Sequence, residues 1–314
     1  MCCRCGIHKK SEDMLGRLEV KDKMNVRARN VDALFYWNCS PNFGDVLSPY
    51  ILRRLLGHDL HWVAPSDQNK FLGVGSILTD QTFYSGGNII WGSGTITPKA
   101  LSPIAYRFPL RRLGRSLHTR IKLIFQPNII LAVRGLRTRM LLERAGSACP
   151  EIFGDPGVLM PRFYKPKVTA ERAPVGIILH HSQSKYAKSA GLKGFRFITI
   201  ERESEEEIEA FIDEVCSCDK IFTTSLHGLI IAQAYGVPAQ WIELRGSPIH
   251  DEASHKFLDY FEGVGVPPQS PVNIDAQGEG FSVLLNFDAP RITVSAEVGD
   301  HLIDVIQPFV SRRK

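Results

Sequence analysis

The sequence lacks any long hydrophobic run, and no apolar stretch approaches the roughly 18 residues needed to cross a bilayer. Residues 1–30 also lack the apolar central region of a secretory signal, so the cytoplasm is the expected compartment. We expect these 30 residues to form a poorly ordered leader. The absences argue against a membrane-spanning or secreted protein, although peripheral contact with the inner face of a membrane stays open.

The cysteines are few, and their spacing suits neither a disulfide framework nor a zinc site. The chain has seven cysteines, an odd number, and only Cys2, Cys3 and Cys5 cluster closely. A disulfide framework is therefore not expected. These cysteines and His8 are too crowded for the separated ligand pairs of a zinc site, so we predict no metal.

Length and pattern indicate an α/β protein with two lobes. The 314 residues exceed the roughly 250–300 at which one hydrophobic core stops growing. A segment rich in proline and polar residues places a boundary near 160–174, giving lobes at 31–165 and 166–314. Short β-rich runs alternate with helical patterns in both parts, as in parallel sheets. The main expected strands are 33–37, 70–74, 88–91, 128–133, 175–179, 196–200, 221–224 and 240–244.

The segment 221–238, IFTTSLHGLIIAQAYGVP, predicts a strand, a turn, an apolar helix and the start of another strand. Ligands in open α/β sheets bind outside the carboxyl ends of strands, where helix N-termini favour anions. Ser225, His227 and Gly228 should therefore line a crevice. On local sequence alone, a capping serine beside a packed histidine explains the turn equally well.

A second strand-turn-helix site follows the run DALFYW. It contains Asn42, Gly44 and Asp45 ahead of an amphipathic helix. Taken alone, this NFGD motif favours a simpler interpretation, in which Asp45 caps the helix and Gly44 supplies the turn geometry.

Together these two motifs and the segments between them resemble the polysaccharide pyruvyltransferase family over about residues 31–265. The resemblance rests on NFGD at 42–45, FLGVGSIL at 71–78, IIWGSGT at 89–95, VRGLRTR at 133–139, GDP at 154–156, LHH at 179–181, SLHGLIIAQAYGVP at 225–238 and KFLDYFEGVG at 256–265. It implies two Rossmann-like lobes facing a cleft, similar to the GT-B architecture. It also implies transfer of pyruvate from phosphoenolpyruvate onto a sugar as a ketal, in synthesis of exopolysaccharides and cell-surface glycans.

This reaction needs a proton shuttle, and His227 suits it because imidazole titrates near neutral pH. Asp45 would orient an acceptor hydroxyl or take its proton. Close approach of the ligand would be allowed at Gly44, Ser93, Gly94 and Gly228. No cofactor is expected beyond phosphoenolpyruvate as co-substrate.

Anion binding is expected from Arg134, at a strand end, and from Arg137, in the first turn of the next helix. Basic residues there oppose the helix dipole unless they face an anion. Some family members carry an arginine where this chain has Ser225, so another group must replace that contact or it is absent. Lys256 is a further candidate for contact with the anion, although a surface lysine is the commoner explanation. His181 would lie on the opposite wall, or pack at a strand end.

Basic residues gather between Lys99 and Arg144, where eleven Lys or Arg accompany the single acid Glu143. The segment 107–122 interleaves them with apolar residues, which suits anionic lipid headgroups or the diphosphate of a lipid-linked glycan acceptor. A merely solvated basic face explains it as well. No nucleic-acid partner is predicted, because no recognisable binding module is present.

Two other functions fit the same features. A GT-B-like glycosyltransferase would use similar anion-binding turns for a nucleotide sugar. A noncatalytic glycan-binding relative would explain the serine at position 225.

Overall fold

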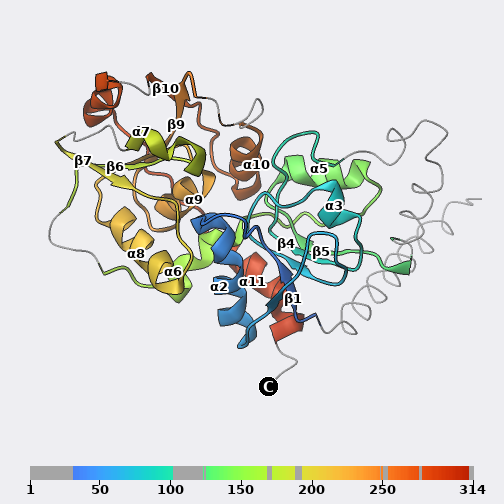
Figure 1. Cartoon of the computed structure of the whole chain (residues 1–314). Coiled ribbons are helices and arrows are strands. Elements are labelled where there is room, and N and C mark those ends of the chain that lie inside the picture. Colours follow the sequence, from blue (N-terminus) through green and yellow to red (C-terminus); the bar gives the residue numbers. More distant parts are fainter. Residues whose placement is uncertain are drawn as a thin grey trace, which may run out of the picture.

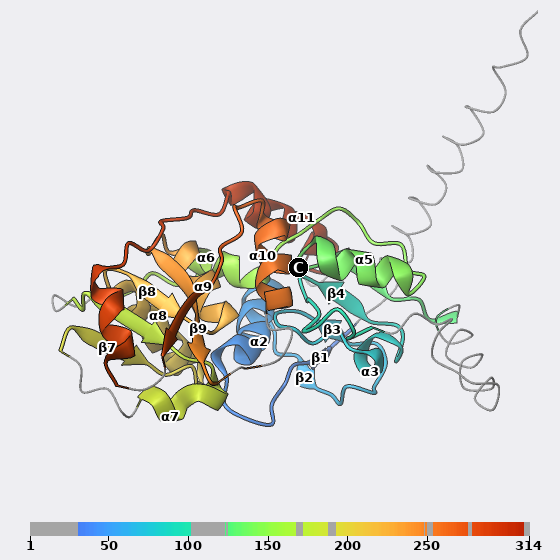
Figure 2. The same ribbon diagram turned by 90° about the horizontal axis from the view of Figure 1, so that it is seen from above.

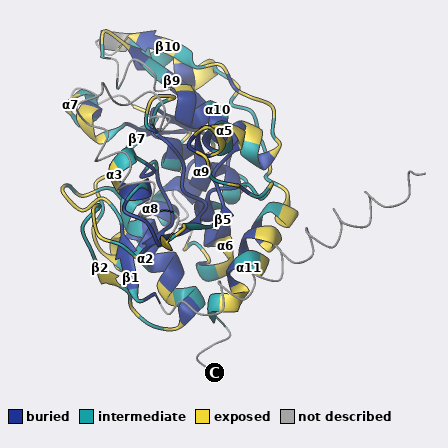
Figure 3. Cartoon of the chain, turned by 90° about the vertical axis from the view of Figure 1, so that its right-hand side faces the viewer, coloured by how far each residue is buried: buried dark blue, intermediate teal, exposed yellow. Residues whose placement is uncertain are grey.

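The computed structural model describes residues 31–101, 123, 125–167, 172–187, 193–247, 249, 254–275 and 278–310. Two parallel five-stranded sheets with flanking helices form an α/β protein, which confirms the predicted fold class and is consistent with two Rossmann-like lobes (Figure 1). The leader 1–30 and the basic segment 107–122 lie outside the described residues. The central strands of both sheets are mostly buried, while yellow, exposed residues gather on outer loops and helix faces (Figure 3).

The first sheet has the strand order β2-β1-β3-β4-β5. Its strands are β1 (Ala33–Phe35), β2 (His61–Trp62), β3 (Phe71–Leu72), β4 (Ile89–Trp91) and β5 (Ile129–Ala132), and its helices are α2 (Phe43–Leu56), α3 (Asp80–Phe83) and α5 (Leu136–Arg144). The short helices η2 (Pro156–Leu159) and α6 (Met160–Phe163) lead to the second sheet.

The second sheet has the order β10-β9-β8-β6-β7. Its strands are β6 (Val175–Ile178), β7 (Phe195–Ile198), β8 (Ile221–Thr223), β9 (Ala239–Arg245) and β10 (Val272–Asp275). The helical elements of this part are η3 (His181–Gln183), α7 (Ser184–Ala187), α8 (Glu205–Cys216), α9 (Leu226–Ala234), α10 (Ser254–Val264), η4 (Gly278–Asn286) and α11 (Ala296–Val310).

Both sheets share one topology. Numbered from its own first strand, each sheet reads 2-1-3-4-5, so the strand order reverses between β1 and β3 in the first and between β6 and β8 in the second. In such sheets ligands bind beyond the carboxyl ends of the strands at the reversal. The topology therefore directs attention to the turns that follow β1 and β8.

The eight main strands that the sequence predicts are present, each displaced by no more than two residues at either end. The prediction omitted β2 and β10, which are edge strands. β2 has only two residues, both exposed, and β10 contains only one buried residue. An edge strand with little buried surface has too weak a hydrophobic pattern to be recognised from sequence.

The two lobes meet through a continuous hydrophobic core. One cluster of buried residues includes Leu34 and Phe71 of the first sheet together with Ile178 and Ile221 of the second. At this junction Phe43 of α2 stacks on Phe211 of α8, with ring centroids 4.1 Å apart. Figure 2 shows α2 and α10 between the lobes.

The C-terminal helix α11 returns to the first sheet. Trp91 of β4 donates a hydrogen bond from Nε1 to the Leu302 carbonyl at 2.8 Å, and the rings of Phe71 and Phe309 meet edge to face. The strands follow the sequence division at 165/166, but α11 comes from the later part of the chain and packs on the earlier part. The lobe boundaries and a cleft between the lobes stay predictions.

In the part of the chain that the structure describes, no helix is both long and apolar enough to span a membrane.

Candidate functional site

Two strand-to-helix turns, one from each lobe, meet at the lobe junction. Asn42 begins α2 as its N-cap, and its Oδ1 accepts a hydrogen bond from the Gly44 N–H at 3.1 Å. The turn after β8 leads into α9, which is buried over most of its length because it is apolar on nearly all sides. These elements bring Asn42, Gly44 and Asp45 next to His227.

His227 lies directly over Gly44. A Cβ atom at position 44 would overlap the imidazole ring of His227, so only glycine fits beneath it. The His227 side chain keeps 13% of its surface exposed. The ring is therefore held by the backbone of the other lobe while one part remains accessible.

The carboxylate of Asp155 lies next to the imidazole of His227. The Oδ2 atom of Asp155 is 3.6 Å from Nε2 of His227, and neither atom has a hydrogen-bond partner among the described residues. The other oxygen, Oδ1, accepts from the Gly157 N–H at 2.9 Å and caps η2. A completely buried carboxylate in this position places a negative charge beside the imidazole.

Sequence reasoning did not select Asp155, although it belongs to the GDP motif at 154–156. The motif itself resembles a helix cap, since Asp followed by Pro commonly starts a helical turn. The proximity of Asp155 to His227, 72 positions later, arises only from the packing of η2 against α9.

Asp45 and Lys256 bring opposite charges to the same place. Burial raises the pKa of the Asp45 carboxyl to about 6, with His227, Asn42 and Lys256 acting in the opposite direction. Burial lowers the pKa of the Lys256 ammonium to about 8, helped by Arg134 and opposed by Asp45. Lys256 is 8% exposed and forms no hydrogen bond or ion pair with a described residue. Both groups titrate close to neutral pH, as groups at ligand sites commonly do.

Arg134 is completely buried and already has protein partners. Its Nε donates to Asp259 Oδ2 at 3.0 Å, Nη1 to Ser76 Oγ at 2.6 Å and Nη2 to the Thr95 carbonyl at 2.6 Å. Thr138 also donates to Asp259, from its backbone N–H and its hydroxyl. Arg134 therefore joins α10 to the first lobe, whatever else it binds.

The basic start of α5 also has protein partners. Arg137 forms a bidentate pair with Glu262 of α10, its Nε and Nη2 lying 2.8–3.1 Å from the carboxylate oxygens. Arg139 pairs with Glu143 and Glu151. These carboxylates supply the negative charge that the sequence pattern assigned to a ligand. The Arg137 side chain is 38% exposed, and its carboxylate partner differs from the one that His227 faces.

The other predicted site residues have mainly structural contacts. Ser93 is buried and donates to the Gly73 carbonyl, and a Cβ at Gly94 would overlap the Arg134 guanidinium. A Cβ at Gly228 would press on the Thr223 hydroxyl at 2.7 Å. Ser225 is the buried N-cap of α9, and its side chain makes no capping bond. His181 is exposed beyond the end of β6, and its ring is tilted by 39° against that of its neighbour His180, with ring centroids 4.1 Å apart.

Within the described ranges, no group of three His, Cys, Asp or Glu side chains is arranged to hold a metal ion. The arrangement instead combines an imidazole, a carboxyl group of raised pKa and a lysine of lowered pKa. It is suited to moving protons beside an anion.

Comparison with known proteins gives the family. Residues 42–244 match the model of the polysaccharide pyruvyl transferase family, which covers more than half of the chain and includes Asp45, Asp155 and His227. The chain is also similar to an uncharacterized protein of Acanthamoeba polyphaga mimivirus, with 27% identity over 140 residues. That match covers 43% of this chain and 47% of the viral protein.

Proposed function

The chain belongs to the polysaccharide pyruvyl transferase family, and from this premise we propose the reaction that it catalyses. It transfers pyruvate from phosphoenolpyruvate to a sugar of a polysaccharide or of its lipid-linked precursor, forming a pyruvate ketal. The observation that carries the proposal is the position of His227, backed by Asp155 and placed over Gly44 beside Asp45. A proton donor and a proton acceptor thereby stand together at the lobe junction.

The proposed reaction adds two sugar hydroxyls to one carbon. The methylene carbon of phosphoenolpyruvate gains a proton, a sugar hydroxyl forms a bond to the neighbouring carbon, and the bond from that carbon to the phosphate oxygen breaks. A second hydroxyl of the sugar then closes the ketal. Of the two hydroxyl protons, one replaces the proton delivered to the new methyl group and the other leaves with phosphate or water.

His227 suits the proton transfer to carbon, because an imidazole can carry the proton and the buried Asp155 carboxylate lies beside it. Asp45 suits the acceptor side. A carboxyl group with a pKa of about 6 is largely ionised at neutral pH and still basic enough to take a hydroxyl proton.

Lys256 is the favoured contact for the donor's carboxylate or phosphate, since it is a buried cation without an ion pair among the described residues. The guanidinium of Arg134 uses three of its five N–H groups on protein acceptors, which leaves two for the donor. Together they would compensate for the family arginine that Ser225 replaces.

The test measures phosphate release from phosphoenolpyruvate with a panel of soluble and lipid-linked oligosaccharides, followed by mass spectrometry of the acceptor. We expect phosphate release together with an acceptor gain of pyruvate minus water. His227→Ala should lower turnover by about 100-fold or more. His301→Ala, on the exposed face of α11, is the matched control and should retain normal turnover.

Near-normal turnover by a folded His227→Ala protein would contradict the assigned role. Turnover of a sugar nucleotide without use of phosphoenolpyruvate would replace the proposal with a glycosyltransferase. Saturable glycan binding without any turnover would indicate a noncatalytic relative.

A further inference from the structure

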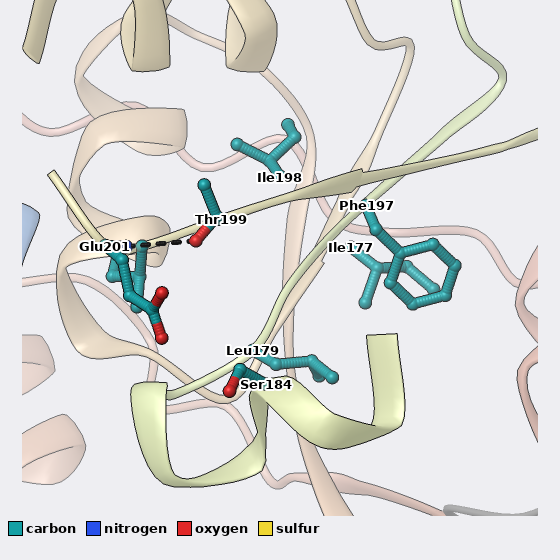
Figure 4. Close-up of a pocket in the computed structure, with 8 residues that line it drawn as sticks. Ile177, Leu179, Ser184, Phe197, Ile198, Thr199 and Glu201 are labelled. Atoms are coloured by element: carbon teal, nitrogen blue, oxygen red, sulfur yellow. Dashed lines mark hydrogen bonds between the residues drawn. The ribbon is translucent and has the colours of Figure 1, made fainter. Parts of the chain in front are cut away.

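A separate pocket lies in the second lobe, beyond the residues assigned to catalysis. It lies at the carboxyl ends of β6 and β7, against the start of α7, and has a volume of ≈ 330 Å³ (Figure 4). This is near the lower end of the roughly 300–1,000 Å³ found for small-molecule sites. The pocket is therefore large enough for one small ring and too small for an extended ligand.

The walls of this pocket combine apolar surface with a few oxygen atoms. Ile177, Leu179 and Phe197 supply the apolar part, while Ser184, Thr199 and Glu201 supply two hydroxyls and a carboxylate. Figure 4 shows the Glu201 carboxylate and the Ser184 hydroxyl turned toward the same space.

The turn after β7 fixes the polar groups. The Glu201 N–H donates to the Thr199 hydroxyl at 3.2 Å, which holds the turn in place. The Glu201 side chain is exposed and forms no ion pair with a described residue. Its carboxylate thus remains available to accept hydrogen bonds from a ligand.

The charge of the pocket selects the class of ligand. Among the described residues, no lysine or arginine lines it, while one carboxylate does. A phosphate or carboxylate ligand would meet like charge without a compensating cation. A neutral sugar ring fits better, because its C–H face packs on apolar side chains and its hydroxyls donate to a carboxylate.

The pocket is also connected to the proposed reaction site. The Phe43 N–H donates a hydrogen bond of 2.8 Å to the carbonyl of Ile200, a pocket residue. Phe43 stands between Asn42 and Gly44, at the start of the helix that carries Asp45. A glycan bound in the pocket would lie beside the turn that presents Asp45.

We infer that this pocket binds one neutral sugar ring of the acceptor glycan. The inference rests on the proposed function, because a bound sugar is an acceptor only if the protein transfers a group to it. It assigns acceptor recognition to the second lobe, through Ser184 and Glu201, and leaves the donor to the residues around His227.

Two pocket variants test this assignment in the pyruvyl transfer assay. Glu201→Gln keeps the shape and removes the charge, and Ser184→Leu fills the space. Each should raise the KM for the acceptor about tenfold and leave the KM for phosphoenolpyruvate unchanged. Glu203→Gln is the matched control, because it removes an exposed carboxylate two residues from Glu201 and does not line the pocket. Unchanged acceptor KM in both folded pocket variants would overturn the inference while leaving the proposed function intact.

A binding measurement keeps the test independent of turnover. Saturation-transfer NMR with a panel of methyl pyranosides on the His227→Ala protein should detect at least one sugar, and its signal should disappear in the His227→Ala, Ser184→Leu double variant. This result, together with no turnover of phosphoenolpyruvate by the wild-type protein, would support the sugar pocket and reject the proposed function. Equal signals in both proteins, or none with any sugar, would overturn the inference.

Discussion

Two groups of buried charges meet near the lobe junction, and their partners differ. Around Arg134 and Asp259 each charged group has hydrogen bonds of 3.0 Å or less to protein atoms. Around His227, the nearest carboxylate oxygen is 3.6 Å away and unpartnered among the described residues, and Lys256 lacks an ion pair there.

The difference separates structural charges from functional ones. Buried charges with complete partners fix an arrangement, whereas buried charges without partners cost stability unless a ligand completes them. The same kind of substitution should therefore have opposite effects in the two places.

Removal of a charge from the satisfied group gives the largest expected effect. Asp259→Ala leaves the Arg134 guanidinium and Thr138 without their acceptor, so the free energy of unfolding should fall by about 3–5 kcal/mol. Denaturant unfolding checks this. The matched control is Glu262→Ala. Glu262 lies on α10, as Asp259 does, and the loss of its exposed pair with Arg137 should cost less than about 1 kcal/mol. Equal losses in the two variants would contradict the distinction between them.

Removal of a charge from the other group should stabilise the protein. The pKa of Lys256 is lowered in the folded state, so the unfolded chain binds more protons between about pH 8 and its ordinary pKa, and stability rises with pH across that window. Lys256→Met should raise the free energy of unfolding at pH 7 by about 2 kcal/mol and abolish this rise. It should also weaken binding of phosphoenolpyruvate.

Urea titrations of both proteins at pH 7 and pH 9.5, with calorimetric titration of phosphoenolpyruvate, measure these effects. A less stable Lys256→Met protein that still binds phosphoenolpyruvate normally would place Lys256 in the structural group.

The effect of the Asp155–His227 pair on catalysis can be measured separately from its effect on folding. Asp155→Asn retains an oxygen for the Gly157 N–H but removes the charge that faces His227. Turnover should fall about 10- to 100-fold and its pH profile should change, because the carboxylate charge beside His227 is lost. Asp300→Asn, at the exposed pair with Arg162, is the control. An Asp155→Asn enzyme with an unchanged rate and pH profile would remove Asp155 from the mechanism.

The smallest expected effect concerns pH. If Asp45 accepts a proton as its carboxylate, activity falls when the pH drops through its pKa of about 6. Turnover at pH 5 should then be about a tenth of the plateau value, and Asp45→Asn should have a lower rate without this acidic limb. A wild-type profile that stays flat from pH 7.5 to pH 5 would exclude this role.

Much of the fold follows from local patterns in the sequence. Buried parallel strands form short apolar runs between turns, which is why β6 and β8 were predicted nearly to the residue. The turns carrying Asp45 and His227 were predicted for the same reason, since capping and turn residues mark helix starts. Edge strands such as β2 carry no comparable pattern.

The partners of charged side chains could not be predicted in this way. Arg134 and Arg137 were both expected to face an anion, and the structure gives each a protein carboxylate from α10, more than 120 positions later in the chain. Asp155 resembles an ordinary helix cap in the sequence and becomes the partner of His227 through packing alone.

The sequence by itself determined the alternation of strands and helices, the two strand-to-helix turns and the family, because these depend on neighbours along the chain. Only the tertiary structure decided which charges are satisfied, which lobe α11 covers and where a sugar-sized pocket lies beside α2. Hydrogen bonds and burial between distant segments are set by how elements pack, and local sequence carries little information about that packing.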